Sequence, residues 1–289
     1  MRNVLTRDGR TLRLNEAGTD HGPVVLVQHG TPMSGRLFEP HVRDAERRGI
    51  RLVAYDRPGY GGSTPAPGRT IADAAEDVRA IADSLEVERL VVWGISGGGP
   101  HALACAALLP DRVAAVASLA AVAPIDADGL DWLAGMGQAN LDEFAAVRRG
   151  REALEEYLRH DAAQLLAVDA GGLLAVLESL LAPVDAAVLT GELAEYFVAC
   201  TRDAVGGGVD GWRDDDLAFD KPWGFAVEAI RMPVLLWHGE HDLFSPFAHG
   251  EWLAAHIPTV EARLSDEDGH LTLLQRRIPE AHAWLLERL

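Results

Sequence analysis

A serine enclosed by glycines, at residues 94–98, is the feature that most restricts how this chain can fold. The pentapeptide Gly-Ile-Ser-Gly-Gly follows the apolar run 90–93 and precedes the helix-like apolar stretch 99–109. This order predicts a buried strand, a tight turn and a helix, with Ser96 at the apex of the turn. Glycines two positions before and two after the serine leave space where Cβ atoms would collide with the strand and the helix. The pattern therefore predicts a strand–turn–helix unit that exposes a serine hydroxyl.

The predicted position of Ser96 suggests a chemical role. At a helix N-terminus the first backbone N–H groups lack partners within the helix, and their partial positive charge stabilises an oxyanion beside the hydroxyl. Serine and glycine are common residues, so the pentapeptide alone also fits a glycine-rich turn that caps a helix. Covalent acyl chemistry is favoured if a carboxylate and then a histidine follow in the order that this architecture requires.

A carboxylate and a histidine do follow in that order. The apolar run 233–237 predicts a buried strand that leads into a turn carrying Asp242. The predicted strand 260–264 is followed by a polar loop and a helix, which places His270 just after the last strand. Loops at the carboxyl ends of parallel strands gather at one sheet edge. We therefore predict Ser96 as nucleophile, His270 as general base and Asp242 as the acid that orients it.

Other residues compete for two of these roles. Glu240 lies in the same turn as the predicted acid, and Asp126 follows an earlier strand-like segment, so both are alternatives for the carboxylate. His238 and His241 flank the predicted acid, but only His270 follows the last predicted strand.

Two further loops carry a family resemblance. The strand-like run 24–28 ends in His-Gly-Thr-Pro at 29–32, which resembles an HG-x-P loop, and residues 55–63 match the pattern D-x-P-G-x-G-x-S. Together with the serine turn, they make the chain resemble the α/β-hydrolase superfamily, near its proline iminopeptidase and haloperoxidase-like branches. The resemblance implies an α/β-hydrolase fold with a mostly parallel central sheet, flanking helices and a helical cap insertion. It also implies an oxyanion hole formed by the backbone N–H groups of Thr31 and Gly97.

The chain departs from several branches of that family. Ser96 stands where the dehalogenase and epoxide-hydrolase branches place aspartate. The proline iminopeptidase branch normally reads HGGPG in the oxyanion loop and GGSWG at the serine turn. Here residues 29–33 read His-Gly-Thr-Pro-Met and residues 94–98 read Gly-Ile-Ser-Gly-Gly, which counts against peptidase activity.

A change of pattern divides the chain. Residues 126–225 lose the alternation of strands and helices and show helical periodicity instead. We expect residues 1–125 and 226–289 to form the core domain and residues 126–225 to form a helical cap. By the family resemblance, the cap covers the catalytic edge and shapes the substrate pocket. The expected substrate-binding residues lie just past the oxyanion loop or soon after the chain leaves the core: Met33, Leu37, Trp132 and Met136.

Charge and cysteine content limit the partners. The formal net charge is −18, and residues 126–225 carry twenty Asp and Glu against seven Lys and Arg. An acidic surface repels nucleic acid, although solubility alone accounts for most surface carboxylates. Cys105 and Cys200 are far apart and lack C-x-x-C spacing, so neither a disulfide framework nor a metal site is expected.

The N-terminal residues lack an apolar signal core, and no run reaches the roughly 18 apolar residues that a membrane span needs. We expect a soluble, cytoplasmic monomer or homodimer that binds a small-molecule substrate and no cofactor, membrane or nucleic acid.

The combined expectation is a cofactor-free serine hydrolase that cleaves carboxylic esters, lactones or small amides through an acyl-enzyme. One alternative is an aminopeptidase of the proline iminopeptidase type, in which Glu192, Glu195 or the run 214–216 holds the free amine of the substrate. Another is a non-hydrolytic lyase, oxygenase or ligand-binding protein, because the same fold supports such functions.

Overall fold

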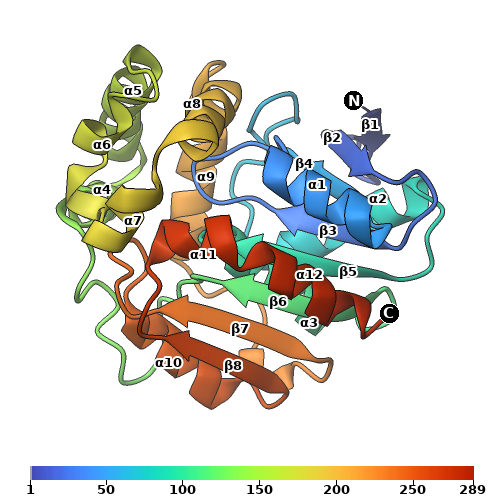
Figure 1. The fold of residues 1–289 in the computed structure, drawn as a ribbon. Helices are drawn as coiled ribbons and strands as arrows, with labels where there is room; N and C mark the ends of the chain where they lie inside the picture. Colours follow the sequence, from blue (N-terminus) through green and yellow to red (C-terminus); the bar gives the residue numbers. More distant parts are fainter. Residues whose placement is uncertain (1) are drawn as a thin grey trace.

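The computed structural model describes residues 2–289, in which eight strands form one sheet (Figure 1). The strands are β1 (Arg2–Leu5), β2 (Thr11–Gly18), β3 (Val24–Gln28), β4 (Arg51–Tyr55), β5 (Leu90–Ile95), β6 (Val113–Leu119), β7 (Val234–Gly239) and β8 (Val260–Ser265). Their order across the sheet is β1-β2-β4-β3-β5-β6-β7-β8. The two pairings of β2 are antiparallel and all the others are parallel. This confirms the mostly parallel central sheet expected from the sequence.

The central strands are apolar because both of their faces are covered. Every residue of β3, β5, β6 and β7 is buried, as expected of parallel strands with helices on both sides. Successive residues of β3 alternate between two hydrophobic clusters: Val24 and Leu26 belong to one, Val25 and Val27 to the other. The edge strand β8 is more exposed and carries charged side chains, which discourages pairing with another chain.

Six helices cover the two faces of the sheet. They are α1 (Glu39–Arg48), α2 (Ala74–Ser84), α3 (Gly98–Leu108), α10 (Phe247–His256), α11 (His270–Arg276) and α12 (Ile278–Leu286). Helices α1, α11 and α12 lie on the face turned to the viewer in Figure 1, whereas α2, α3 and α10 lie behind the sheet. The chain thus forms three layers, with one hydrophobic core on each face of the sheet.

The segment between β6 and β7 contains helices and no strand. It includes α4 (Gln138–Arg149), α5 (Arg151–Ala167), α6 (Leu173–Val176), α7 (Pro183–Val188), α8 (Gly191–Val205) and α9 (Asp210–Phe219). In Figure 1 these helices stand beyond the end of the sheet toward which the arrowheads of β7 and β8 point. We refer to residues 126–225 as the helical segment. Its assignment as a separate cap remains a prediction.

No helix within residues 2–289 has the length and apolar character needed to cross a lipid bilayer.

Candidate active site

Ser96 lies in the tight turn between β5 and α3. Its φ angle is 56°, in the left-handed region that a serine seldom adopts. Its backbone N–H donates to the carbonyl oxygen of Leu119 at 2.9 Å, which ties the turn to β6. A Cβ atom on Gly94 would collide with the carbonyl group of Gly98, and one on Gly98 would collide with that of Gln28. The glycines are therefore required by the close approach of α3 to β3 and β5.

The loop after β3 lies directly against this turn. A Cβ atom placed on Gly30 would sit 3.4 Å from the Cβ of Ser96, and one on Gly97 would collide with the side chain of Thr31. Within residues 2–289, no acceptor is bonded to the backbone N–H of Thr31 or of Gly97. The structure therefore brings Thr31 and Gly97 together beside Ser96, with both of these N–H groups unpaired.

Asp242 and His270 form a buried pair at the same edge of the sheet. The Nδ1 atom of His270 lies 2.7 Å from Oδ2 of Asp242, and the two residues are 5% and 2% exposed. The other carboxylate oxygen, Oδ1, accepts the backbone N–H groups of Phe244 and Ser245, each at 2.8 Å. These bonds hold the carboxylate so that one oxygen remains directed at the imidazole.

The surroundings of His270 favour its protonated form. Burial by itself lowers the pKa of His270, but the carboxylate of Asp242 outweighs that effect, and Asp185 acts in the same direction as Asp242. The pKa of His270 therefore lies above its ordinary value. A histidine of this kind accepts a proton readily from a neighbouring hydroxyl.

Asp185 on α7 holds His270 in a second way. Its carboxylate accepts the backbone N–H groups of His270 and Leu271 at 2.8 Å and that of Thr272 at 3.0 Å. These are N–H groups of the first turn of α11, which would otherwise lack partners. The sequence did not identify this cap, because Asp185 lies 85 residues from His270.

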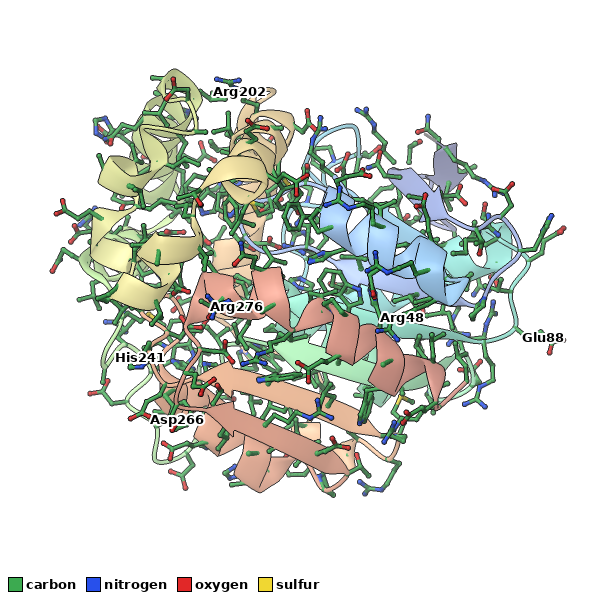
Figure 2. The ribbon with its side chains drawn as sticks, viewed as in Figure 1. Arg48, Glu88, Arg202, His241, Asp266 and Arg276 are labelled. Atoms are coloured by element: carbon green, nitrogen blue, oxygen red, sulfur yellow. The ribbon has the colours of Figure 1, made fainter. Side chains whose placement is uncertain are left out.

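The alternative residues lie elsewhere. Glu240, Asp126 and His241 are exposed, and Figure 2 shows His241 at the periphery of the molecule. His238 is buried, but its Nε2 lies 2.6 Å from the carbonyl oxygen of Ser245 and 3.9 Å from Asp242. Unlike these alternatives, His270 both lies within hydrogen-bonding distance of Asp242 and lines the cavity described next.

A cavity of about 440 Å³ lies between the sheet edge and the helical segment. Ser96, His270, Thr31 and Met33 line it from the core side. The helical segment supplies an apolar wall, formed by Leu173, Val176, Leu177, Leu180 and Phe197. It also supplies a polar wall, formed by Gln138, Asn140, Asp142, Glu143, His160 and Asp161. Residues 126–225 thus shape the space in front of Ser96.

Three of the four expected substrate-binding residues do not line this cavity. Trp132 is buried, its indole N–H donates to the carbonyl oxygen of Ala123 at 2.8 Å, and its ring lies 4.6 Å from that of Phe144. Met136 is buried in the same hydrophobic cluster, and Leu37 packs on the opposite face of the sheet. Trp132 and Met136 fill the core and Leu37 is half-buried against it, so Met33 alone of the four lines the cavity.

The carboxylates considered for amine binding are also absent from the cavity lining. Glu192 is exposed and pairs with Arg43 at 3.1 Å, and Glu195 is exposed. The run 214–216 is buried and does not face the cavity. Glu143, which the sequence did not single out, does line it.

Within residues 2–289 no group of three or more His, Cys, Asp or Glu side chains is placed to hold a metal ion. Cys105 and Cys200 are both buried and free.

Comparison with known proteins supports the architecture. A family model described as alpha/beta hydrolase fold matches residues 23–276. The AB hydrolase superfamily protein YisY of Bacillus subtilis is 26% identical over 274 residues, which are 92% of this chain and 91% of that protein. A pimeloyl-[acyl-carrier protein] methyl ester esterase of Aromatoleum aromaticum is 30% identical over 246 residues, 83% of this chain and 87% of the esterase.

Among solved structures, a thermophilic esterase from Thermogutta terrifontis has the same fold. Its TM-score is 0.71 at 21% identity, over 99% of this chain and 98% of the esterase. The family model covers most of the sequence, including the serine turn and the loops that carry Asp242 and His270. The chain therefore belongs to the alpha/beta hydrolase fold family.

Proposed function

We propose that this protein is a serine hydrolase that cleaves small carboxylic esters through an acyl-enzyme. The observation that carries the proposal is the 2.7 Å contact of His270 with Asp242 at a cavity that also exposes Ser96. A nucleophile, a base and an acid that orients the base form the constellation used for acyl transfer on many folds.

The chemistry proceeds in two halves. The Oγ atom of Ser96 attacks the ester carbonyl carbon while Nε2 of His270 takes the hydroxyl proton. The resulting oxyanion accepts hydrogen bonds from the free N–H groups of Thr31 and Gly97. The intermediate collapses, the C–O bond to the alcohol breaks, and His270 returns the proton to the departing oxygen. Water then attacks the acyl-enzyme with the same base, and this step releases the acid and restores Ser96.

The cavity indicates the kind of ester. Leu173, Leu177 and Phe197 offer apolar surface to an acyl chain, and a volume of about 440 Å³ suits a small molecule. The carboxylate of Asp142 also lines the cavity and disfavours substrates with negative charge. We therefore propose neutral esters or lactones of moderately apolar acids. Relatives named as methyl ester esterases and as a bifunctional esterase/perhydrolase support ester chemistry.

The test combines active-site labelling with turnover. A fluorophosphonate probe is expected to label the wild type and not Ser96→Ala. The control Ser84→Ala, which changes a half-buried serine outside the cavity, retains labelling. A series of p-nitrophenyl esters of increasing acyl length then gives turnover, and aminoacyl anilides serve as the comparison. Preference for the anilides would favour an aminopeptidase. Labelling without turnover of any ester would favour a lyase, an oxygenase or a ligand-binding protein.

A further inference from the structure

The strongest feature outside the catalytic residues is a buried ionic cluster that joins helix α9 to the core. Asp215 on α9 is 0% exposed, and its carboxylate lies 2.6 Å from the guanidinium groups of both Arg57 and Arg69. The hydroxyl of Tyr60 donates to it at 2.8 Å. Burial alone would raise the pKa of Asp215, but Arg57 and Arg69 hold that pKa well below its ordinary value. The carboxylate is therefore ionised, although it lies in the interior.

This cluster reaches the loop beside Ser96. The Thr31 hydroxyl donates to Oδ2 of Asp215 at 2.7 Å and accepts from Nη2 of Arg57 at 3.0 Å. The same Nη2 donates to the carbonyl oxygen of Gly30 at 3.2 Å, and Arg57 also binds the carbonyl oxygen of His29. Three successive residues of the loop are thus fixed by one carboxylate and one guanidinium group.

These contacts determine where the N–H of Thr31 points. The C=O of Gly30 and the N–H of Thr31 belong to one trans peptide unit, so they point in opposite directions. The Gly30 carbonyl oxygen accepts from Nδ1 of His29 at 2.7 Å, from the backbone N–H of Met33 at 3.1 Å and from Arg57 at 3.2 Å. The N–H of Thr31 is therefore turned away from the cluster. Asp215 contributes to this arrangement, since it pairs with Arg57 at 2.6 Å and binds the Thr31 side chain directly.

The same carboxylate also faces the serine turn. Nε2 of His101 on α3 lies 3.7 Å from Oδ1 of Asp215, and Nδ1 of His101 lies 2.7 Å from the carbonyl oxygen of Gly97. Burial lowers the pKa of His101 to about 3, so the ring is neutral and donates from Nδ1 to that carbonyl. Asp215 therefore lies behind both segments that supply the free N–H groups.

We propose that Asp215 is a positioning residue that sets the direction of the Thr31 backbone N–H through the Thr31 hydroxyl and Arg57. This inference rests on the proposed ester hydrolysis, because it assigns that N–H to the oxyanion. The helical segment then contributes to the reaction as well as to the pocket, although Asp215 itself touches no substrate. Geometric errors of about 1 Å at such a group cost on the order of a hundredfold in rate, and loss of a whole donor costs roughly 100- to 1,000-fold in kcat.

The deciding variants change the Thr31 side chain and leave the ionic cluster in place. Thr31→Val keeps the branched shape and removes the hydroxyl, so kcat is expected to fall about 10- to 100-fold with little change in KM. Thr31→Ser keeps the hydroxyl, and its fall in log kcat is expected to be no more than half of the fall seen in Thr31→Val. Thr19→Val, which removes a half-buried hydroxyl bonded to the carbonyl oxygen of Gly49 at 2.9 Å, serves as the matched control. Circular dichroism and thermal melting establish that each variant is folded.

Asp215→Asn tests the carboxylate itself, with the same expected fall in kcat at nearly constant KM. If it does not fold, the comparison of Thr31→Val with Thr31→Ser decides alone. Wild-type kcat in Thr31→Val, or equal losses in the Val and Ser variants, would overturn the proposal.

The rate of fluorophosphonate labelling separates this proposal from the proposed function. The phosphonyl oxygen occupies the same hole as the ester oxyanion, so Thr31→Val should label more slowly than Thr31→Ser even if no ester is turned over. Labelling with that difference but without turnover would refute ester hydrolysis and retain the role of Asp215. A wild type that neither labels nor turns over ester would overturn both.

Discussion

Phe244 stacks on the imidazole of His270, with ring centroids 4.3 Å apart and an angle of 24° between the planes. Phe244 also donates its backbone N–H to Asp242 at 2.8 Å, so one residue covers the proposed base and holds the proposed acid. The ring limits tilting of the imidazole and keeps water from the hydrogen bond between His270 and Asp242. This part of the loop is therefore expected to matter for catalysis through its side chain.

Replacing Phe244 with alanine tests that expectation. The backbone bond to Asp242 stays, whereas the stacked surface is lost, so kcat should fall by about 10- to 100-fold, the range typical of a misplaced catalytic group. Steady-state kinetics on a short p-nitrophenyl ester measure the change. Phe247→Ala is the control, since Phe247 packs near His238, with centroids 6.3 Å apart. An equal loss in both variants would assign the effect to general loosening of the loop.

Ser96→Ala and His270→Ala should each reduce kcat by several orders of magnitude while leaving the fold intact. The residues act as a unit, so the double variant should lose little more than either single variant. The residual rate reflects the oxyanion hole and substrate binding. Near wild-type turnover by Ser96→Ala would falsify the covalent mechanism.

The pH dependence of kcat/KM follows from the surroundings of His270. The base must be neutral to accept the serine proton, and Asp242 raises the pKa of His270 above its ordinary value. Activity should therefore rise with pH through a midpoint above about 6.5, the unperturbed histidine value. Asp242→Asn should lower that midpoint and also reduce kcat, because the imidazole loses both its charge partner and its orientation. A pH-stat assay from pH 5 to 9 measures both quantities.

The control for that assay is Asp126→Asn, which changes an exposed alternative acid. It should leave the profile as in the wild type. If Asp126→Asn moves the midpoint and Asp242→Asn does not, the acid has been assigned to the wrong residue.

The apolar wall of the cavity should set the preferred acyl length. Leu177 lines the cavity, whereas Leu174, three residues earlier, is 41% exposed and does not. Leu177→Ala should move the optimum of an acyl-length series toward longer chains, since one methylene of contact is worth about 1 to 3 kcal/mol of discrimination. Leu174→Ala should leave the series unchanged. The same shift in both variants would place the acyl chain elsewhere.

The protonation of Glu143 should make the stability of the folded protein depend on pH. Burial raises the pKa of Glu143 to about 7, and the pKa of neighbouring Asp216 also lies well above its ordinary value. In the folded protein, Glu143 and Asp216 therefore keep protons that the unfolded chain releases near pH 4. The contribution of these two groups to stability is complete below that pH. It is lost as the pH rises through about 7.

Glu143→Gln keeps the acceptor for the indole N–H of Trp212, which lies 2.7 Å away, and removes the charge. The variant should melt at a higher temperature than the wild type at pH 8 and differ less from it at pH 5. Glu178→Gln, at an exposed position in the same segment, is the control. A variant that is less stable at pH 8 would contradict the raised pKa.

The serine turn and the meeting of Asp242 with His270 could be predicted because the positions of these residues follow from local rules. Gly94 and Gly98 leave the space that the turn needs, and Asp242 and His270 each follow a recognisable apolar strand. The order of strands in a parallel sheet then brings the loops to one edge. The mostly parallel sheet itself could be predicted from the same alternation.

The pocket and the buried cluster could not be predicted in this way. Asp215 lies 158 residues from Arg57 and 146 from Arg69, so the run 214–216 resembles a solvated acidic patch until the chain is folded. Helical periodicity identifies an apolar face but not the neighbour that it meets, which is why Trp132 was expected in the pocket and lies in the core. Each miss depends on contacts between segments far apart in the sequence.

The shared carboxylate of Asp215 also has a consequence for unfolding. Moving α9 away from the sheet would leave two buried guanidinium groups without their counter-ion, and unpaired buried charges are strongly unfavourable. Residues 126–225 are therefore expected to melt together with the sheet in a single cooperative transition, and not as a hinged lid that opens while the rest stays intact. Substrate would then reach Ser96 by diffusing past the rim of a fixed enclosure.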